Sequence, residues 1–503
     1  MFRAHLSFDT THRVGTIDRR LFGSFVEHLG RCVYDGIYEP GHELADERGF
    51  RRDVMELVRE LGVSTVRYPG GNFVSGYRWE DGVGPRDQRP RRLDLAWHST
   101  ETNEVGLDEF VDWCRDTDVE LMYAVNLGTR GVQEALDVLE YANIHGQTTL
   151  SDARIANGHQ EPHNIRMWCL GNEMDGPWQL GHGTAEEYGR LASKTARAMR
   201  QVDEDLELVV CGSSHAQMPT FGEWERVVLQ ETYDEVDYIS CHAYYEPHNG
   251  DYGSFLASAV NMDRFIDTVV ATADHVKALK RSDKTINISF DEWNVWYVSR
   301  YQNVEKITDV TQWPVAPRLL EDQYTVMDAV VFGNLLISLV RHADRVTAAS
   351  LAQLVNVIAP IMTEPGGKAW RQTTFFPFAL TSELARGAAV DVSLEAPTYD
   401  TTAHGTVPLV DAIATVDDET GRVSVFCVNR SMTDEAELTI DLARVGGLAL
   451  TSATTLSDDD VHASNTLDDP DRVAPHRNST ARVDGETCTV TLPAVSWSVL
   501  TFE

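Results

Sequence analysis

The stretch IRMWCLGNEMDGPWQ, residues 165–179, shows the pattern that decides the fold. Its apolar run 165–170 is typical of a buried strand, and the glycine and proline near its end are typical of a loop. Between them stand Asn172 and Glu173, two adjacent polar side chains. A carboxylate at that position is unfavourable unless it is paired or used. We therefore expect Glu173 either to bond a neighbouring loop or to take part in chemistry.

A second strand ends in the same way. In TINISFDEWNVWYVSR (285–300), the run 286–290 is followed by Asp291 and Glu292. Side chains alternate between the two faces of a strand, so the pattern predicts that these two carboxylates point in different directions. Both remain candidates for a functional carboxylate, with Glu292 favoured.

From residue 18 to 385, short apolar strands alternate with amphipathic helices. The predicted strands are 21–26, 64–68, 121–125, 165–170, 206–211, 238–242, 286–290 and 346–354. The predicted helices include 50–61, 107–116, 184–202 and 263–280. This alternation predicts an α/β protein built on a (β/α)8 TIM barrel. A doubly wound sheet is the competing arrangement, but no Gly-rich dinucleotide turn follows the first strand.

Polar residues stand at the C-terminal ends of most predicted strands, the face on which barrel enzymes build their sites. They are Glu27, Arg67, Asn126, Asn172, Glu173, Ser213, Ser214, Tyr244, Glu292 and Gln353. Glu173 and Glu292 follow the fourth and seventh strands, which lie across the barrel mouth from each other. Paired carboxylates in that arrangement are what glycoside hydrolysis requires, one as acid and the other as nucleophile or base.

The two ends of the chain have a different texture from the barrel segment. From about residue 388 helical periodicity disappears, and alternating segments such as GRVSVFCVNR (421–430) predict strands. We therefore expect residues 386–503 to form an all-β, jelly-roll-like sandwich, and residues 1–17 to add a strand to it. The polar stretch 458–480 is predicted to be a long exposed loop.

The charge of the chain excludes several classes of partner. Its formal net charge is -35, so nucleic acid and anionic membranes are disfavoured. Lysine is rare among the basic residues, which fits a protein adapted to a salty cytoplasm, where ions screen self-repulsion. A GC-rich genome with an acidic proteome explains the composition equally well. Stability that does not increase in molar salt would contradict the first explanation.

Cysteine usage and hydropathy indicate a cytoplasmic protein. The seven cysteines are scattered without paired spacing, which predicts reduced, mostly buried thiols and neither a zinc site nor a disulfide framework. Residues 1–11 lack the apolar segment of a secretory signal. No apolar run approaches the ~18 residues that a membrane helix requires.

Taken together, the motifs resemble those of the α-L-arabinofuranosidases of glycoside hydrolase family 51, from about residue 20 to 380 and in the same order. The matching stretches are GSFVEHLGRCVYDGIYEP (23–40), VRYPGGNFVSGYRWEDGVGPRDQRP (66–90), LAWHSTETNEVGLDEF (95–110), AVNLGTRG (124–131), CLGNEMDGPWQ (169–179), CHAYY (241–245), DEWNVWY (291–297) and AQLVNVIAPI (352–361). The resemblance implies a retaining, exo-acting enzyme that removes terminal α-L-arabinofuranosyl units from arabinan- or arabinoxylan-derived oligosaccharides. It implies no cofactor, and it suggests a hexamer.

The resemblance also assigns roles to individual residues. Glu173 would be the acid/base and Glu292 the nucleophile, with Asn172 bonding the sugar 2-hydroxyl and Tyr244 orienting Glu292. The other expected substrate-binding residues are Glu27, Asn72, Gln353, Trp97 and Trp178. Four of them have a purely structural alternative: a buried carboxylate for Glu27, a turn residue for Asn72, and a loop anchor for either tryptophan. No metal site is expected from His28, His98 and His242, because their spacing lacks a paired-ligand pattern.

Two alternatives remain open at this stage. The same scaffold could act on glucans or xylosides, and aryl glycosides of each sugar would separate these specificities. A non-catalytic carbohydrate-binding protein is the alternative from another class, although both glutamates are present. The sequence leaves the natural oligosaccharide and its linkage undetermined.

Overall fold

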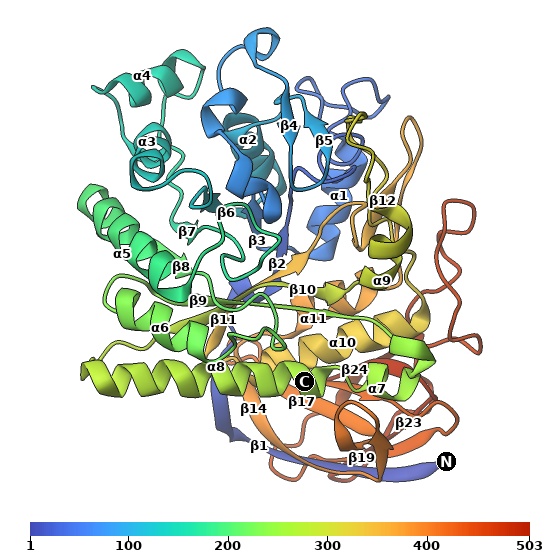
Figure 1. The fold of residues 1–503 in the computed structure, drawn as a ribbon. Helices are drawn as coiled ribbons and strands as arrows, with labels where there is room; N and C mark the ends of the chain where they lie inside the picture. Colours follow the sequence, from blue (N-terminus) through green and yellow to red (C-terminus); the bar gives the residue numbers. More distant parts are fainter.

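A closed barrel of eight parallel strands forms the centre of the computed structural model, which describes residues 1–503 (Figure 1). The barrel strands are β2 (Gly23–Phe25), β3 (Thr65–Tyr68), β6 (Glu120–Val125), β7 (Met167–Leu170), β8 (Glu207–Val210), β9 (Tyr238–Tyr245), β10 (Asn287–Val295) and β11 (Val346–Ala352). They neighbour one another in chain order, and β11 closes the ring between β10 and β2. The predicted (β/α)8 architecture is confirmed, and each of the eight predicted strands overlaps one of these.

Helices surround the barrel and connect its strands. They are α1 (Arg52–Leu61), α2 (Leu107–Thr117), α3 (Val132–Asn143), α4 (Thr149–Ala156), α5 (Ala185–Val202), α6 (Glu223–Thr232), α7 (Tyr252–Leu256), α8 (Ala259–Lys280), α9 (Val298–Arg300), α10 (Val326–Arg341) and α11 (Phe375–Leu384). Local sequence explains where α5 starts: Thr184 accepts a hydrogen bond from the backbone of Glu187, whose side chain caps Thr184 in return. None of the helices is both long and apolar enough to cross a membrane.

The C-terminal part of the chain forms a ten-stranded sheet. Its strands are β14 (Ala388–Glu395), β17 (Val410–Val416), β18 (Val423–Asn429), β19 (Ala436–Asp441), β20 (Leu450–Leu456), β21 (His476–Arg477), β22 (Arg482–Asp484), β23 (Thr487–Leu492) and β24 (Ser496–Phe502), together with β1 (Phe2–Thr16). Strands from opposite ends of the order, β20 and β23, contribute Ala453 and Val490 to the same apolar cluster. The sheet therefore curls back on itself into a two-layered, strand-rich unit, as predicted.

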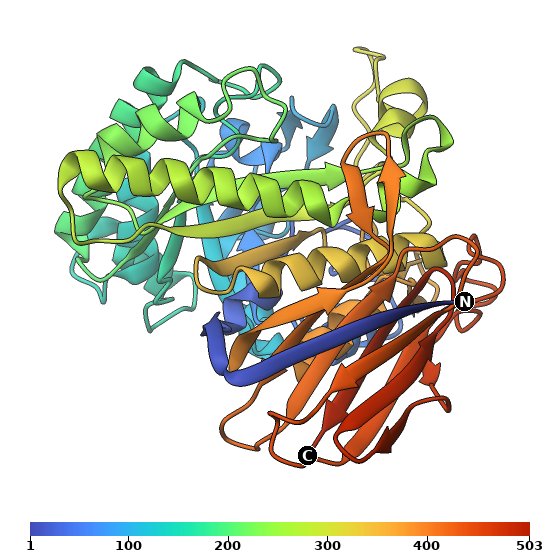
Figure 2. The same ribbon diagram turned by 90° about the horizontal axis from the view of Figure 1, so that it is seen from below.

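Strand β1 lies in the middle of this sheet, although it is the first element of the chain (Figure 2). It pairs antiparallel with β14, where Thr16 faces Ala388, and parallel with β19, where Phe2 faces Ala436. Short hairpins complete the strands: β4 (Arg92–Asp94) with β5 (Ser99–Glu101), β12 (Ile361–Thr363) with β13 (Ala369–Arg371), and β15 (Thr398–Thr401) with β16 (Gly405–Pro408).

Helix α10 joins the barrel to the sheet. Every residue from Val326 to Val340 is buried, and a helix that is apolar on all sides is stable only inside the protein. At its centre Gly333 allows close approach of the Trp497 indole, since a β-carbon at residue 333 would lie 2.3 Å from Trp497 Cδ1. One face of the sheet thus shares an apolar core with the barrel.

The stretch 458–480 is mostly an exposed loop, as predicted, but it is anchored to the protein at several points. Its backbone bonds the start of α10, where Val326 N donates to Ala463 O at 3.0 Å. Ala463, Asn465 and Val473 are buried, and the two Asn465–Val473 hydrogen bonds fix the loop internally. The polar composition predicted the exposure, whereas the few apolar and amide residues that anchor the segment were not predicted.

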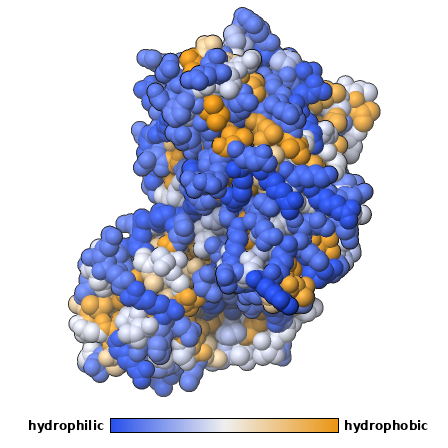
Figure 3. Space-filling model, turned by 90° about the vertical axis from the view of Figure 1, so that its left-hand side faces the viewer, coloured by the Kyte–Doolittle hydropathy of each residue, from blue (hydrophilic) through white to orange (hydrophobic).

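All seven cysteines are buried and unpaired. The face of the molecule in Figure 3 is mostly hydrophilic, with hydrophobic residues in several separate groups rather than in one continuous surface.

Candidate active site

The two glutamates singled out in the sequence meet at the C-terminal mouth of the barrel. Glu173 follows β7, and Glu292 lies within β10. A carboxylate oxygen of Glu173 and one of Glu292 are within 4.8 Å of each other. Retaining glycosidases place their two carboxyl groups about 5–5.5 Å apart, whereas inverting enzymes need about 6.5–9.5 Å to admit water. The separation is that of a retaining pair.

An irregularity in β10 brings Asp291 into the same cluster as Glu292. Ser289 pairs with Ser240 of β9, and Glu292 pairs with His242, so β10 holds one extra residue between these pairs. Such a bulge interrupts the alternation of side chains along a strand. The prediction that Asp291 and Glu292 point in different directions was therefore wrong: both contact the Arg67 guanidinium.

Glu292 is held by one cation and one phenol. Arg67 Nη1 donates to Glu292 Oε1 at 2.7 Å, and Tyr244 OH donates to Oε2 at 2.7 Å. Arg67 Nη2 also donates to Asn172 Oδ1 at 2.6 Å. Burial works against the charge of Arg67, but the neighbouring carboxylates outweigh it and raise its pKa well above the ordinary value. Both oxygens of Glu292 are thus oriented by hydrogen-bond donors, one of them charged.

Glu173 has a different environment. Its Oε2 accepts a hydrogen bond from Trp178 Nε1 at 2.6 Å, and its Oε1 lies 2.9 Å from His242 Nδ1. Burial and the charge of Glu292 raise the pKa of Glu173, although the contacts with His242 and Trp178 oppose the shift. A raised pKa keeps a carboxyl group protonated near neutral pH, as a general acid requires.

The backbone of Glu173 is in the left-handed region, with φ of 45°. Residues other than glycine adopt that conformation at a cost of about 1–2 kcal/mol, and they concentrate at functional sites. Glu173 was singled out in the sequence because polar residues follow a strand at once. In the structure this pattern corresponds to a strained turn.

Glu27 follows β2, the barrel strand that lies between β11 and β3. Its Oε1 accepts hydrogen bonds from Phe73 N at 2.8 Å and from Trp97 Nε1 at 2.9 Å, and its Oε2 accepts one from Gln353 Nε2 at 3.1 Å. Burial raises the pKa of Glu27 to about 8, despite these donors. Gly71 permits this approach, because a β-carbon there would lie 2.5 Å from Glu27 Oε2.

Asn72 lies in the chain between Gly71 and Phe73, which border Glu27, and its side chain contacts Asn172. It begins the short 3-10 helix η2 (Asn72–Gly76), and Asn172 Nδ2 lies 3.3 Å from Asn72 Oδ1. Asn172 Nδ2 also lies 3.4 Å from Gln179 Oε1. Trp178 stands at the rim of the site, 49% exposed and stacked against His215.

The structure thus places the expected catalytic and substrate-binding residues in hydrogen-bonded groups, one around Glu27 and the others around Arg67 and Glu173. These residues are Glu27, Asn72, Trp97, Asn172, Glu173, Trp178, Tyr244, Glu292 and Gln353. Sequence reasoning missed the central place of Arg67 and His242. Both stand in otherwise apolar barrel strands, TVRY and YISCHAYY, and an ionisable residue inside a buried strand was the available signal.

His242 joins three carboxylates in the floor of the site. Its Nε2 lies 2.9 Å from Asp291 Oδ1, and its Nδ1 lies 2.9 Å from Glu173 Oε1 and 3.6 Å from Glu292 Oε2. The atoms of Glu173, His242 and Glu292 are close enough to approach one metal ion. Their contacts instead satisfy one another, since both ring nitrogens face carboxylates, and Glu292 is bonded by Arg67 and Tyr244 as well.

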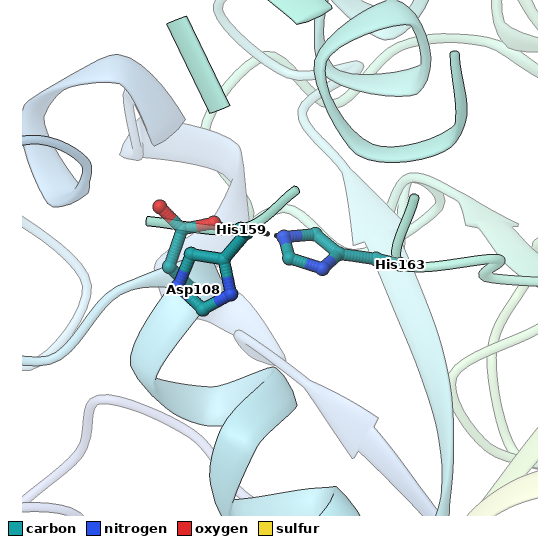
Figure 4. Close-up of side chains that lie close together, drawn as sticks. All are labelled: Asp108, His159 and His163. Atoms are coloured by element: carbon teal, nitrogen blue, oxygen red, sulfur yellow. Dashed lines mark hydrogen bonds and ion pairs between the residues drawn. The ribbon is translucent and has the colours of Figure 1, made fainter. Parts of the chain in front are cut away.

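A second histidine cluster lies beside α2 (Figure 4). Asp108 accepts a hydrogen bond from Tyr141 OH at 2.6 Å, and its other oxygen lies 2.8 Å from His163 Nε2. The ring of His159 packs edge-on against His163. These contacts tie α2, α3 and the segment before β7 together. The histidines considered earlier lie apart from this cluster and from one another: His28 contacts Glu101 and Tyr68, and His98 stacks on Trp313.

Comparison with known proteins places the chain in a family. It matches two family models, the α-L-arabinofuranosidase 1 domain over residues 57–270 and the α-L-arabinofuranosidase C-terminal domain over residues 291–496. It is 60% identical to an intracellular exo-α-(1→5)-L-arabinofuranosidase of Streptomyces lividans, over 99% of this chain and 75% of that protein. It is 59% identical to an exo-α-(1→6)-L-arabinofuranosidase of Bifidobacterium longum, over 99% of this chain and 97% of that protein.

The fold agrees with these sequence relationships. A solved family 51 α-L-arabinofuranosidase from Bifidobacterium longum superimposes with a TM-score of 0.96 at 50% identity, and the match covers 100% of both chains. An α-L-arabinofuranosidase of the same family from Thermotoga petrophila has a TM-score of 0.88 at 35% identity, covering 99% of this chain and 100% of that one. With the paired glutamates at the barrel mouth, these findings show that the chain belongs to the α-L-arabinofuranosidases of glycoside hydrolase family 51.

Proposed function

We propose that Glu173 and Glu292 carry out the hydrolysis of terminal, non-reducing α-L-arabinofuranosyl residues with retention of configuration, Glu173 as acid/base and Glu292 as nucleophile. The chain is an exo-acting α-L-arabinofuranosidase, like its relatives at about 60% identity. The observation that supports the residue assignment is the contrast between the two carboxylates. They lie within 4.8 Å, yet Glu292 is oriented by Arg67 and Tyr244, whereas burial raises the pKa of Glu173.

In the first step Glu292 attacks the anomeric carbon, and the bond to the leaving oxygen breaks. Glu173 gives its proton to that oxygen, so the departing saccharide leaves as a neutral alcohol. The ester between Glu292 and arabinose is then the glycosyl-enzyme. Esterification removes the negative charge of Glu292, and with it one of the causes that raise the pKa of Glu173.

In the second step the ionised Glu173 takes a proton from water, and the resulting hydroxide equivalent attacks the anomeric carbon. The ester breaks, Glu292 returns to its carboxylate form, and Glu173 is protonated again. L-Arabinose is released with its original configuration, because two inversions have taken place. Neither step calls for a cofactor.

The remaining residues of the site hold the furanose ring. Asn172, which Arg67 orients, bonds the 2-hydroxyl, a contact that strengthens as the oxocarbenium-like transition state forms. Glu27, Asn72 and Gln353 bind the other hydroxyls. Glu27 can both donate and accept there, because a pKa of about 8 leaves it largely protonated at neutral pH. Trp97 and Trp178 supply flat apolar walls.

The substrate is a short arabinofuranosyl oligosaccharide derived from arabinan or arabinoxylan. The two relatives with nearly equal identity are named for (1→5) and (1→6) linkages, so overall similarity does not select between them. Relatives from Streptomyces lividans and Bacillus subtilis are named intracellular, which supports a cytoplasmic location and small imported substrates. We further propose residues 18–385 as the catalytic barrel, with 386–503 and the strand within 1–17 as its companion domain, and a hexamer in solution, to be tested by light scattering.

Substitution of the two glutamates tests the assignment. E292A should abolish turnover of every arabinofuranoside. E173A should retain the first step on an aryl substrate with a good leaving group, and azide should restore turnover by attacking the glycosyl-enzyme without base assistance. E186A, on the exposed side of α5, makes the same change outside the site and should keep wild-type activity. Normal turnover by E292A, or no azide rescue of a folded E173A, would contradict the roles.

Product analysis on a panel tests the substrate. Aryl glycosides of arabinofuranose, xylopyranose and glucose, followed by (1→2), (1→3), (1→5) and (1→6) arabino-oligosaccharides, separate the sugar from the linkage preference. Faster hydrolysis of the xyloside or the glucoside would replace the proposed specificity, and saccharide binding without hydrolysis would replace the proposed activity.

A further inference from the structure

His242 is the one side chain that contacts Glu173, Asp291 and Glu292 together. It lies in β9 and is 2% exposed. Asp291 is bonded to its Nε2 at 2.9 Å, and Glu173 to its Nδ1 at 2.9 Å, while Glu292 lies 3.6 Å from the same Nδ1. A neutral imidazole has a single N–H, so it can donate to a carboxylate on only one side. A doubly protonated ring can donate on both sides at once.

A charge count supports the doubly protonated form. Arg67 contacts Asp291 and Glu292, so one permanent positive charge faces two carboxylates, with Glu173 beside them. If Glu173 carries its acid proton, an imidazolium at His242 makes the buried group neutral. A neutral ring would leave it with a net negative charge, and isolated charges are strongly unfavourable in the interior.

The other titratable groups near His242 do not change this count. They are Asp175, Tyr244, Cys169 and Cys211. Burial raises the pKa of the two thiols and of the phenol well above neutrality, so they are uncharged. Asp175 accepts two hydrogen bonds from Ser214, which satisfy it outside the cluster.

We propose that His242 remains an imidazolium throughout the catalytic cycle and acts as a positioning residue that fixes where Glu173 carries its proton and stabilises the ionised form of Glu173 in the glycosyl-enzyme. This inference rests on the proposed function, because it assumes that Glu173 is the acid/base. His242 itself neither gains nor loses a proton, and Asp291 anchors its charge.

The position of the acid proton follows from the hydrogen bonds. Both oxygens of Glu173 accept a hydrogen bond, but the charged Nδ1–H of His242 on Oε1 is a stronger donor than the neutral indole N–H on Oε2. Oε1 is therefore the carbonyl oxygen, and the acid proton resides on Oε2. Oε2 is the oxygen beside the half-exposed Trp178, whose indole N–H donates to it at 2.6 Å. A leaving oxygen that arrives at the rim therefore meets the protonated oxygen of the carboxyl group.

The second step needs the same charge for another reason. After Glu292 has become an ester, the buried group contains the carboxylates of Glu173 and Asp291 and the cations Arg67 and His242, and it is neutral again. Without the imidazolium, ionising Glu173 would add an unbalanced charge. The contact with His242 lowers the pKa of Glu173, whereas burial raises it. For His242 itself burial lowers the pKa, but the carboxylates outweigh burial and raise it to about 10.

The pH dependence of H242N tests the proposal. Asparagine retains one short donor but has no charge. On an aryl arabinofuranoside with a good leaving group, the second step limits kcat, and that step requires ionised Glu173. We expect the acid limb of the kcat profile of H242N to lie about one pH unit or more above that of the wild type. At a pH below the limb, kcat should therefore be ~10-fold or more lower than in the wild type, and the two kcat values should converge at high pH.

Two further variants serve as controls for this experiment. D291N removes one negative charge of the cluster without touching either glutamate, so the same charge count predicts that the limb stays in place or moves to lower pH, opposite to H242N. H163N changes another buried histidine that pairs with an aspartate, 2.8 Å from Asp108, and should leave the profile in place. The thermal midpoint of each variant reports whether it is folded, so a rate loss from unfolding is recognised.

The outcomes separate this proposal from the assignment of the glutamates. If H242N is folded and merely lowers kcat by the same factor at every pH, or if D291N moves the limb to higher pH as H242N does, the proposal is wrong. If E173A also lacks azide rescue, the acid/base assignment fails first. If E173A is rescued while the acid limb of H242N stays in place, only the inference about His242 fails.

Discussion

Replacing Glu27 by glutamine should make the protein more stable at alkaline pH and less active at every pH. Glu27 is 2% exposed, and burial raises its pKa to about 8 from the ordinary 4.5. Between pH 4.5 and about 8, such a carboxyl group binds more protons in the folded protein than in the unfolded protein. Its contribution to the free energy of unfolding therefore falls as pH rises through that window.

The size of the effect follows from the shift. Each unit of pKa difference corresponds to about 1.4 kcal/mol, so ionising Glu27 in the folded protein costs at most roughly 5 kcal/mol at pH above 8. Glutamine has the same shape and never ionises. Its Oε1 can still accept from Phe73 N and Trp97 Nε1, but its amide would face the amide of Gln353, which offsets part of the gain. We expect a net stabilisation of about 2–5 kcal/mol at pH 8.5 that shrinks towards pH 5.

Urea unfolding of the wild type and E27Q at pH 5, 6, 7 and 8.5 measures this difference directly. Subtracting the two proteins cancels the other ionisable groups, and E186Q in the exposed part of α5 controls for the loss of one surface charge. The difference should grow by up to ~1.4 kcal/mol per pH unit between pH 5 and 8. A difference that stays constant across this range would refute the reasoning, because Glu27 would then ionise in the folded protein as it does in water.

Three further substitutions probe other contacts of the site and the core. Y244F removes the hydrogen bond to Glu292 Oε2 and keeps the ring, so kcat/KM should fall about 10- to 100-fold, as the loss of a charged hydrogen bond predicts, while a normal value would show that Tyr244 does not orient the nucleophile. R67K keeps a charge but cannot bridge Glu292 and Asn172 as the guanidinium does, so kcat/KM should fall ~100-fold or more. Wild-type kinetics of R67K would show that this bridge is not needed. G333A places a methyl group 2.3 Å from Trp497 Cδ1 in the core, so the free energy of unfolding should drop by about 1–3 kcal/mol in urea titrations, with kcat unchanged at low temperature, and an unchanged midpoint would contradict the tight packing described for α10.

Much of the barrel could be predicted from the sequence, because its strands are short apolar runs that are buried on both faces. The strands that carry Glu173 and Glu292 are examples: every residue of β7 is buried, and so are all but the first of β10. Each ends in polar residues, which marks the catalytic face without any knowledge of partners. Local patterns of this kind also gave the start of α5.

Contacts between distant strands could not be predicted in the same way. The bulge in β10 occurs in the sequence FDEW, which contains no glycine or proline to announce it, so alternation gave a wrong orientation for Asp291. Arg67 was recognised only as a polar strand end, because its partners come from β7 and β10, more than a hundred residues away. The order of strands in the C-terminal sheet likewise depends on tertiary contacts that no short segment encodes.

The place of β1 in the middle of that sheet constrains how the chain folds as it is synthesised. Residue Thr16 pairs with Ala388, and Phe2 with Ala436, so both neighbours of the first strand emerge from the ribosome after the whole barrel. At about 5–20 residues per second, translation of the intervening segment takes roughly 20–75 s. Throughout that time the opening strand has two unpaired edges and must be kept from pairing with other nascent chains. A fusion tag or deletion at the N-terminus therefore acts on the last step of assembly, not the first.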